Sequence, residues 1–137
     1  MIATKRQTLF TVSILPGRVF AQVSGGEKSG SVTRWWNGGS LTPVVIGGPP
    51  ETSNITVTNG FDPDVDAAIL QGLKSQINVI RATLTRIYLA GDMTRIPSAK
   101  PDVYTDALLV KLTPVETDAS SGDVATYALE FAPADLT

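Results

Sequence analysis

The stretch that decides the fold is SNITVTNGFDPDVDAAILQGL, residues 53–73, in which the hydrophobic period changes once. Before position 59, apolar and polar residues alternate, as in a half-buried strand. After position 61, the apolar residues recur at helical spacing, at Val65, Ile69 and Leu73. We therefore expect a strand that is followed directly by a helix over about residues 62–75.

The junction between the two periods holds residues suited to a turn and to a helix start. Asn59-Gly60 tolerates the positive φ of a tight turn. Asp62 can cap the helix, and Pro63 fits the first helical position, where no backbone N–H is needed. Asp64 adds negative charge near the positive end of the helix dipole. We interpret Asp62, Pro63 and Asp64 as a helix cap.

The same aspartates have a second interpretation, as calcium ligands. Together with Asp66, they have the spacing that opens an EF-hand loop. Such a loop then needs a glycine and a glutamate where this chain has Ala67 and Leu73. Helix capping explains the acids without a metal, so we predict no metal site.

Length and composition indicate one domain over residues 1–137. The chain is 42% hydrophobic and 18% charged, which is ordinary for a globular protein of this size. Its net charge of −2 gives no general attraction to nucleic acid or to anionic membranes. No run of about 18 apolar residues is present, and MIATKRQTLF lacks the apolar core of a signal peptide. We expect folding in a cytoplasm and no membrane binding.

Two residue types are missing, and this bears on catalysis. The chain has no cysteine, which excludes disulfides and thiolate chemistry, and no histidine, which removes the commonest general base and metal ligand. The acidic residues lie mostly in turns or at the helix cap, with no pair in a recognisable catalytic setting. We predict no enzyme activity, no catalytic residues and no cofactor.

The charges are unevenly placed along the chain. Residues 1–50 carry five basic groups against Glu27 alone, and residues 101–137 carry seven acidic groups against Lys111 alone. This arrangement suits head-to-tail self-association, and internal salt bridges explain it equally well.

The first part of the chain is rich in β-formers and glycine. Residues 8–15 and 18–24 have strand character on either side of Pro16-Gly17, which predicts a hairpin. The glycine–serine stretch 24–31 lacks the lysine and hydroxyl pair that a phosphate-binding loop requires after its last glycine. We expect it to top a hairpin or to flex until a partner orders it.

Two adjacent tryptophans follow, in the expected strand 31–36. Side chains of neighbouring strand residues point to opposite faces, so one of Trp35 and Trp36 can enter the core while the other meets something else. An intersubunit contact, burial beneath a loop and a stacking platform for a sugar or base all remain open. Residues 37–52 are rich in glycine and proline, and we expect a surface arm or a short edge strand with loops.

After the helix, the two-residue period returns over residues 77–90. It slips around Arg86, which predicts either a β-bulge there or a strand end covered on both faces. Residues 91–105 hold two prolines and no clear period, so we expect a long connection.

A hairpin should close the chain, with strands over residues 106–116 and 123–131 and a turn between them. We expect one face of its first strand to carry three aliphatic residues: Leu108, Val110 and Leu112. In all, the sequence predicts a mainly β protein, an antiparallel β-sandwich or barrel of about six or seven strands with one flanking α-helix.

The order of these segments resembles the tail tube proteins of tailed bacteriophages and the related inner-tube proteins of contractile injection systems and type VI secretion. The segments that carry the resemblance are the glycine-rich stretch, RWWNGG, the Gly-Pro-rich segment, ETSNITVTNGFDPDVDA and ALLVKLTPVETDASSGDVATYALEFAP.

The resemblance implies a tail-tube-like domain that forms homohexameric rings, which stack head to tail into a hollow tube in a phage tail. It implies a virion protein, assembled in the bacterial host cytoplasm, that serves as a passive conduit for DNA delivery. Its implied partners are tail sheath, tape-measure and baseplate or tail-tip proteins. The candidates for ring stacking and intersubunit contact are Gly25, Gly26, Glu27, Lys28, Ser29, Gly30, Trp35 and Trp36. The glycine-rich stretch is short for such a contact, and residues 37–52 could share the role.

A conduit should let DNA through without binding it, so its wall should be polar, neutral or acidic, and without basic clusters. We expect some acidic side chains of the C-terminal half to line it. Two other classes of protein remain as alternatives: a carbohydrate-binding β-sandwich that uses Trp35 or Trp36, and a capsid decoration or head–tail joining protein.

Overall fold

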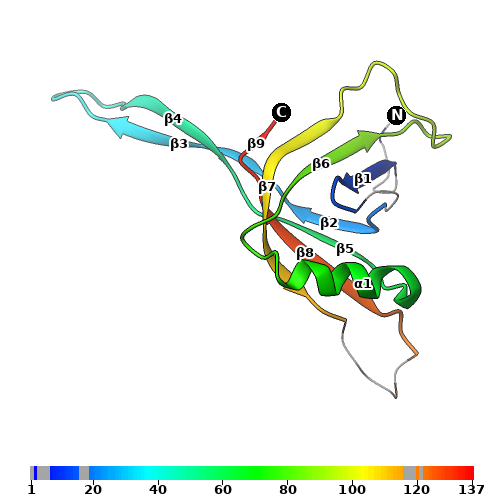
Figure 1. Ribbon diagram of the computed structural model, residues 1–137. Helices are drawn as coiled ribbons and strands as arrows, with labels where there is room; N and C mark the ends of the chain where they lie inside the picture. Colours follow the sequence, from blue (N-terminus) through cyan, green and yellow to red (C-terminus); the bar gives the residue numbers. More distant parts are fainter. Residues whose placement is uncertain (1, 3–6, 16–18, 116–119, 121) are drawn as a thin grey trace.

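The computed structural model describes residues 2, 7–15, 19–115, 120 and 122–137, and these form a curled antiparallel sheet, a two-stranded projection and one helix (Figure 1). In chain order, the elements are β1 Thr8–Val12, β2 Gln22–Gly25, β3 Lys28–Trp35, β4 Val44–Thr52, β5 Ile55–Gly60, α1 Pro63–Lys74, β6 Arg81–Tyr88, β7 Asp102–Thr113, β8 Thr126–Ala132 and β9 Asp135–Leu136. The predicted fold class, mainly antiparallel β with one flanking helix, is confirmed. Within the described residues, no helix is long and apolar enough to cross a membrane.

The main sheet has the strand order β1-β6-β7-β8-β5-β2, with β9 paired to β7. It curls so far that the Phe20 N–H, just before β2, donates to the Phe10 carbonyl of β1 at 3.0 Å. The two ends of the strand order therefore approach each other, as in a barrel. The predicted hairpin between residues 8–15 and 18–24 is wrong, because β1 pairs with β6 and β2 pairs with β5. Its turn, Pro16-Gly17, lies outside the described residues.

The core lies on the inner side of this curl. Sixteen buried residues form one cluster, contributed by the strands of the main sheet, by α1 and by the connections around β1 and β2: Phe10, Val12, Leu15, Phe20, Ile55, Val57, Leu70, Leu73, Ala82, Leu84, Tyr104, Ala107, Leu109, Tyr127, Leu129 and Phe131. Cross-strand partners share a face, so pairs such as Val57 and Leu129 place their side chains together inside.

Strand β7 carries the irregularities of the sheet. Its register against β6 shifts between the pairs Ala82–Ala107 and Leu84–Tyr104, where Asp106 has a φ of 52°. An extra residue with positive φ is a β-bulge, and it lies in β7. Of the two explanations offered for the slip at Arg86, a bulge at that position is therefore wrong. A second shift follows Leu109.

The bulges also redistribute the side chains of β7 between its two faces. Leu112 pairs with Leu129 on the core side, whereas Leu108 pairs with Ala132 on the opposite face. The predicted common face of Leu108, Val110 and Leu112 is therefore wrong. The connection after β6 is shorter than predicted, because β7 begins at Asp102.

The slip in hydrophobic period around Arg86 has a different cause from the predicted bulge. Arg86 lies on the core side at the end of β6, with its guanidinium carbon 5.7 Å from the centre of the Phe10 ring and a guanidinium nitrogen 3.6 Å from Asp102. The Tyr88 hydroxyl donates to the same carboxylate, and this hydrogen bond raises the pKa of Tyr88 above its usual value. Charge pairing and ring contact together explain a cation at an apolar position.

Helix α1 begins with a double cap. Asp62 is the N-cap residue, and its Oδ1 accepts a hydrogen bond from the Asp64 N–H at 3.2 Å, with Pro63 in the first turn. The Asp66 carboxylate, only 2% exposed, accepts in turn from the Asp62 N–H at 2.9 Å. The helix then buries Leu70 and, one turn further, Leu73.

The predicted tight turn at Asn59-Gly60 is wrong, since both residues belong to β5. They pair with Tyr127 and Thr126 of β8, and the Asn59 side chain accepts from the Gly60 N–H at 2.9 Å. The strand therefore continues almost to the N-cap, and the chain changes direction only at Phe61 and Asp62.

Asp66→Ala should destabilise the protein more than a neighbouring surface change. It leaves the Asp62 N–H without this acceptor, so we expect the free energy of unfolding to fall by about 1–3 kcal/mol. Asp64→Ala is the control, since the Asp64 side chain is exposed and its charge acts through the helix dipole alone, worth about 0.3–1 kcal/mol. Urea denaturation followed by circular dichroism measures both values, and equal losses would contradict the double cap.

Candidate functional site

Strands β3 and β4 form a hairpin that extends away from the barrel (Figure 1). We call residues 28–52 the arm and residues 25–28, where it begins, its root. It continues the β2–β5 ladder, because the Gly26 N–H donates to the Asn54 carbonyl at 3.0 Å and the Ser53 N–H donates to the Glu27 carbonyl at 2.8 Å. The prediction that residues 24–31 form a hairpin-top loop is therefore wrong. They pass from one paired strand into the next, and the root of the arm lies within them.

The arm exposes a large amount of apolar surface. All residues of β3 are exposed, as are all of β4 except Thr52. The exposed large apolar side chains of the arm are Val32, Trp35, Trp36, Leu41, Val44, Val45 and Ile46. Over residues 29–50 the only charge is that of Arg34. A two-stranded hairpin is marginal alone in water, and exposed apolar patches of this kind mark interaction surfaces.

Both tryptophans lie on the arm, and neither enters the core. Trp35 is 62% exposed and Trp36 is 57% exposed. The Trp35 indole N–H donates to the Asn37 side chain at 3.2 Å. The expectation that one of the two could enter the core was wrong, because a single layer of two strands has no second layer above it.

The root of the arm is a glycine kink against Tyr104. Gly25 and Gly26 have φ values of 83° and 74°. The Tyr104 hydroxyl donates to the Gly26 carbonyl at 3.0 Å, and a Cβ on Gly26 would lie 2.7 Å from that hydroxyl oxygen. Positive φ and close approach together require glycine at Gly26.

Of the eight sequence candidates, four therefore lie at the root and four on the arm. Gly25, Gly26, Glu27 and Lys28 form the passage from β2 into β3, whereas Ser29, Gly30, Trp35 and Trp36 follow along the arm. At the root, the Lys28 ammonium donates to Asp135 at 3.1 Å, and this hydrogen bond lowers the pKa of the Asp135 carboxyl below its usual value. This ion pair joins the basic first part of the chain to the acidic last part within one subunit.

The outer side of the main sheet is a second uncovered surface, which sequence reasoning missed. The register places these residues together on it, and we call them the open face: Leu9, Thr11, Gln22, Ser24, Thr56, Thr58, Arg81, Thr85, Ile87, Val103, Leu108, Lys111, Thr113, Ala128, Glu130 and Ala132. None of them is buried. The signal in the sequence was the recurrence of threonine between apolar residues.

The charges of the open face are balanced. Lys111 is the direct cross-strand partner of Glu130. Arg81 pairs at 3.2 Å with Asp106, which lies at the bulge beside the face. Among the described residues this surface carries no cluster of like charge, so it is close to neutral.

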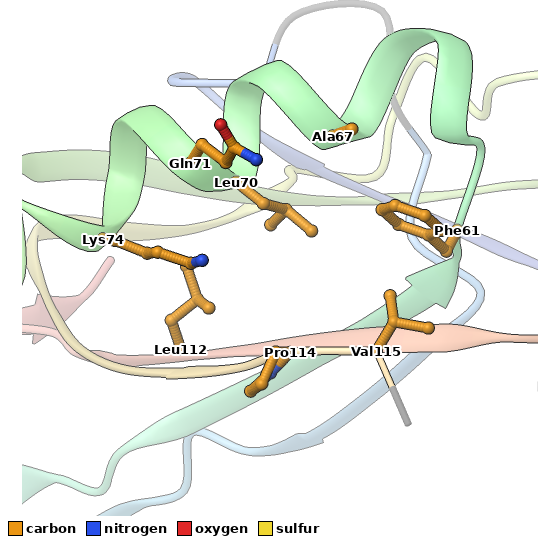
Figure 2. Close-up of a pocket in the computed structure, with 8 residues that line it drawn as sticks. All are labelled: Phe61, Ala67, Leu70, Gln71, Lys74, Leu112, Pro114 and Val115. Carbon is orange, nitrogen blue, oxygen red and sulfur yellow. The ribbon is translucent and has the colours of Figure 1, made fainter. Parts of the chain in front are cut away.

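A cavity of about 220 Å³ lies between α1 and the end of β7 (Figure 2). Its lining is Phe61, Ala67, Leu70, Gln71, Lys74, Leu112, Pro114 and Val115. In Figure 2 Leu70 extends from the helix into the middle of this space, and the end of the Lys74 side chain lies near Leu112. Among the described residues, the lining holds one cation and no carboxylate, and these side chains supply neither an acid–base pair nor a set of metal ligands.

No family model and no curated protein matches the chain, but solved structures do. A chain of the tube-terminating cap of the anti-feeding prophage has a TM-score of 0.81 at 15% identity, covering 100% of this chain and 90% of that one. A chain of the sheath–tube complex of PVC, an extracellular contractile injection system, has a TM-score of 0.76 at 20% identity, with 98% and 88% covered. Hcp1 from Flavobacterium johnsoniae has a TM-score of 0.51 at 14% identity, with 96% and 93% covered.

The chain therefore has the fold of tube and tube-terminator proteins of contractile injection systems. The resemblance inferred from the order of its segments is confirmed at the level of the fold.

Gly26→Ala tests the kink at the root of the arm. The added methyl group combines positive-φ strain with a clash against Tyr104, so we expect the free energy of unfolding to fall by about 2–4 kcal/mol. Gly39→Ala is the matched control, since Gly39 also has positive φ (80°) but a Cβ there meets nothing within 4 Å. Its cost should be about 1 kcal/mol or less, because strain at the tip can relax. Thermal and urea denaturation compare the two variants, and similar losses would show that Tyr104 does not constrain the kink.

Proposed function

We propose that this chain is a structural protein whose copies form stacked hexameric rings and so build the hollow tube of a phage tail or a related injection machine. The observation that carries the proposal is the arm, an apolar hairpin that is exposed along its whole length in the subunit. The fold, shared with tube proteins, supports the same role.

In the proposed tube, the arm supplies the contact between neighbouring copies. Its apolar side chains, with Arg34 as the only charge over residues 29–50, suit burial against another protein surface. The tryptophans near its tip have the size and shape of residues that dominate binding energy at interfaces. The root residues 25–28 set where the arm leaves the barrel, so they act on this contact through the arm.

The open face of the sheet would form the wall of the lumen. Side-by-side joining of sheets from six copies removes exposed strand edges and leaves one face of each sheet toward the channel. The open face is rich in threonine and has balanced charges, which suits passage of DNA without binding. Of the acids expected from the C-terminal half, the described face carries Glu130, with Asp106 beside it.

We assign the chain a passive role in this machine, with no catalysis and no cofactor. Chains with a similar fold occur in the structures of a sheath–tube complex and of a baseplate. Sheath, tape-measure and baseplate or tail-tip proteins are therefore the partners that we propose, in a tail assembled in the bacterial cytoplasm.

A tube terminator is the second candidate function. The match to a chain of a tube-terminating cap favours it, since that structure caps a tube. A terminator would close as a single ring, whereas a tube protein adds ring upon ring. A carbohydrate-binding module or a capsid decoration or head–tail joining protein would form neither stacked rings nor open-ended tubes.

Negative-stain microscopy and sedimentation of the purified protein test the proposal. We expect hollow tubes or stacked hexameric rings; single rings would favour the terminator, and a persistent monomer would contradict both. The double variant Trp35→Ser/Trp36→Ser should raise the concentration needed for assembly at least about tenfold, because a hot-spot residue contributes about 2 kcal/mol or more. Val79→Ser, which alters a 67%-exposed apolar residue outside the arm, is the control and should assemble normally.

The lining of the lumen makes a separate prediction. When the protein assembles in the presence of short duplex DNA, the pelleted tubes should retain little of it. Thr85→Lys adds a cation to the open face of every copy, so it should increase the retained DNA, with a steep decrease at higher salt. Ser75→Lys adds the same charge at the end of α1 and should retain no more than wild type. Equal retention by both variants would contradict the assignment of the open face to the lumen.

A further inference from the structure

Lys28 connects two parts of the molecule that lie far apart in the sequence. It is the first residue of β3, and its Nζ donates to the Asp135 Oδ1 and to the Leu136 carbonyl, each at 3.1 Å. Both acceptors belong to β9, which lies beside the root of the arm in Figure 1. The contact is therefore made between the arm and a strand of the barrel.

Strand β9 is itself fixed to the barrel. The Thr137 N–H donates to the Val103 carbonyl at 2.8 Å, and the Val103 N–H donates back at 3.1 Å. The Ala134 N–H donates to the Thr105 carbonyl at 3.0 Å. These bonds attach both ends of β9 to β7, so the two oxygen atoms that Lys28 reaches do not move with the arm.

A second anchor lies two residues earlier, where the Tyr104 hydroxyl donates to the Gly26 carbonyl at 3.0 Å. Tyr104 is the register partner of Leu136, so both anchors arise from one place in the barrel. One anchor would fix only the position of the chain at the glycine kink. Two anchors, at Gly26 and Lys28, also fix the direction in which the arm leaves it.

We infer that Lys28, Asp135 and Leu136 form a latch that sets the direction of the arm in the free subunit, with Lys28 as a positioning residue. The purpose that we give to the latch rests on the proposed function, in which the arm contacts a neighbouring copy. An arm that already points toward its contact in the neighbouring copy loses less conformational freedom on assembly. The direction itself is a property of the single subunit, and it can be measured there.

The latch should act as a bias and not as a rigid lock. The side chains of Lys28 and Asp135 are 40% and 51% exposed, so water and salt weaken their pairing. Removing such a pair should change the population of the latched direction by about two- to fivefold. Loss of the latch should therefore widen the range of arm directions while the barrel stays folded.

Pulsed electron–electron spin resonance between two spin labels measures this range. The chain has no cysteine, so Ser40→Cys at the arm tip and Thr58→Cys on β5 give two unique labelling sites. The measurement uses dispersed, unassembled subunits. Lys28→Gln removes the latch, and Lys100→Gln, which removes an exposed lysine of the connection before β7, is the matched control.

We expect one narrow distance distribution for the labelled parent and for Lys28→Gln a broader distribution with about a two- to fivefold smaller latched fraction. Lys100→Gln should match the parent. Lys28→Glu should broaden the distribution, and adding Asp135→Lys should restore part of the latched fraction by reversing the pair. An unchanged distribution in Lys28→Gln, with the thermal transition intact, would overturn the latch, as would a parent distribution that is already broad.

The assembly experiment separates this inference from the proposed function. If the unlabelled wild-type protein never forms rings or tubes, the proposed function fails, while the distance distributions still decide the latch. If wild type assembles and the distances do not respond to Lys28→Gln, the latch fails and the tube role stands.

Discussion

The structure depends on one constraint: the main sheet curls on itself, and this covers its inner face and leaves its outer face open. Curling brings Phe10 and Phe20 together and encloses the core, and α1 adds Leu70 and Leu73 to it. Within the described residues no second layer covers the open face or the arm. The single subunit therefore leaves two surfaces, the open face and the arm, that its own fold does not bury. In a polymer of identical copies, neighbouring subunits can contact both surfaces.

The arm connects the architecture of the subunit to that proposed assembly. The β3–β4 pairing of the arm follows directly on the β2–β5 pairing, so the backbone hydrogen bonds of the arm continue those of the barrel. The glycine kink at Gly26 turns it out of the sheet, and Tyr104 fills the space that any larger residue would need. A buried aromatic residue of the core thus determines where an exposed apolar hairpin begins.

Local chemistry predicted some elements well and others poorly. Asp62-Pro63 marks the helix start because capping involves only neighbouring residues. The strand predicted over residues 123–131 corresponds to β8, in which buried Tyr127, Leu129 and Phe131 alternate with more exposed residues. Strand order depends on contacts between distant segments, so the hairpin expected around Pro16 was wrong. The bulge at Asp106 shifts β7 by one residue, which no periodicity could reveal. For residues 37–52 the composition predicted a surface arm or a short edge strand with loops, but only the register shows that the arm begins at Lys28.

The central claim is that the arm is covered by neighbouring copies when the protein assembles, and intrinsic fluorescence tests it most directly. The chain has two tryptophans, and both lie on the arm, so their emission reports on the arm alone. Emission should be that of water-exposed indole in dispersed subunits and should shift to shorter wavelength in the sedimented rings or tubes. Assemblies whose tryptophans still emit as water-exposed indole would contradict the account.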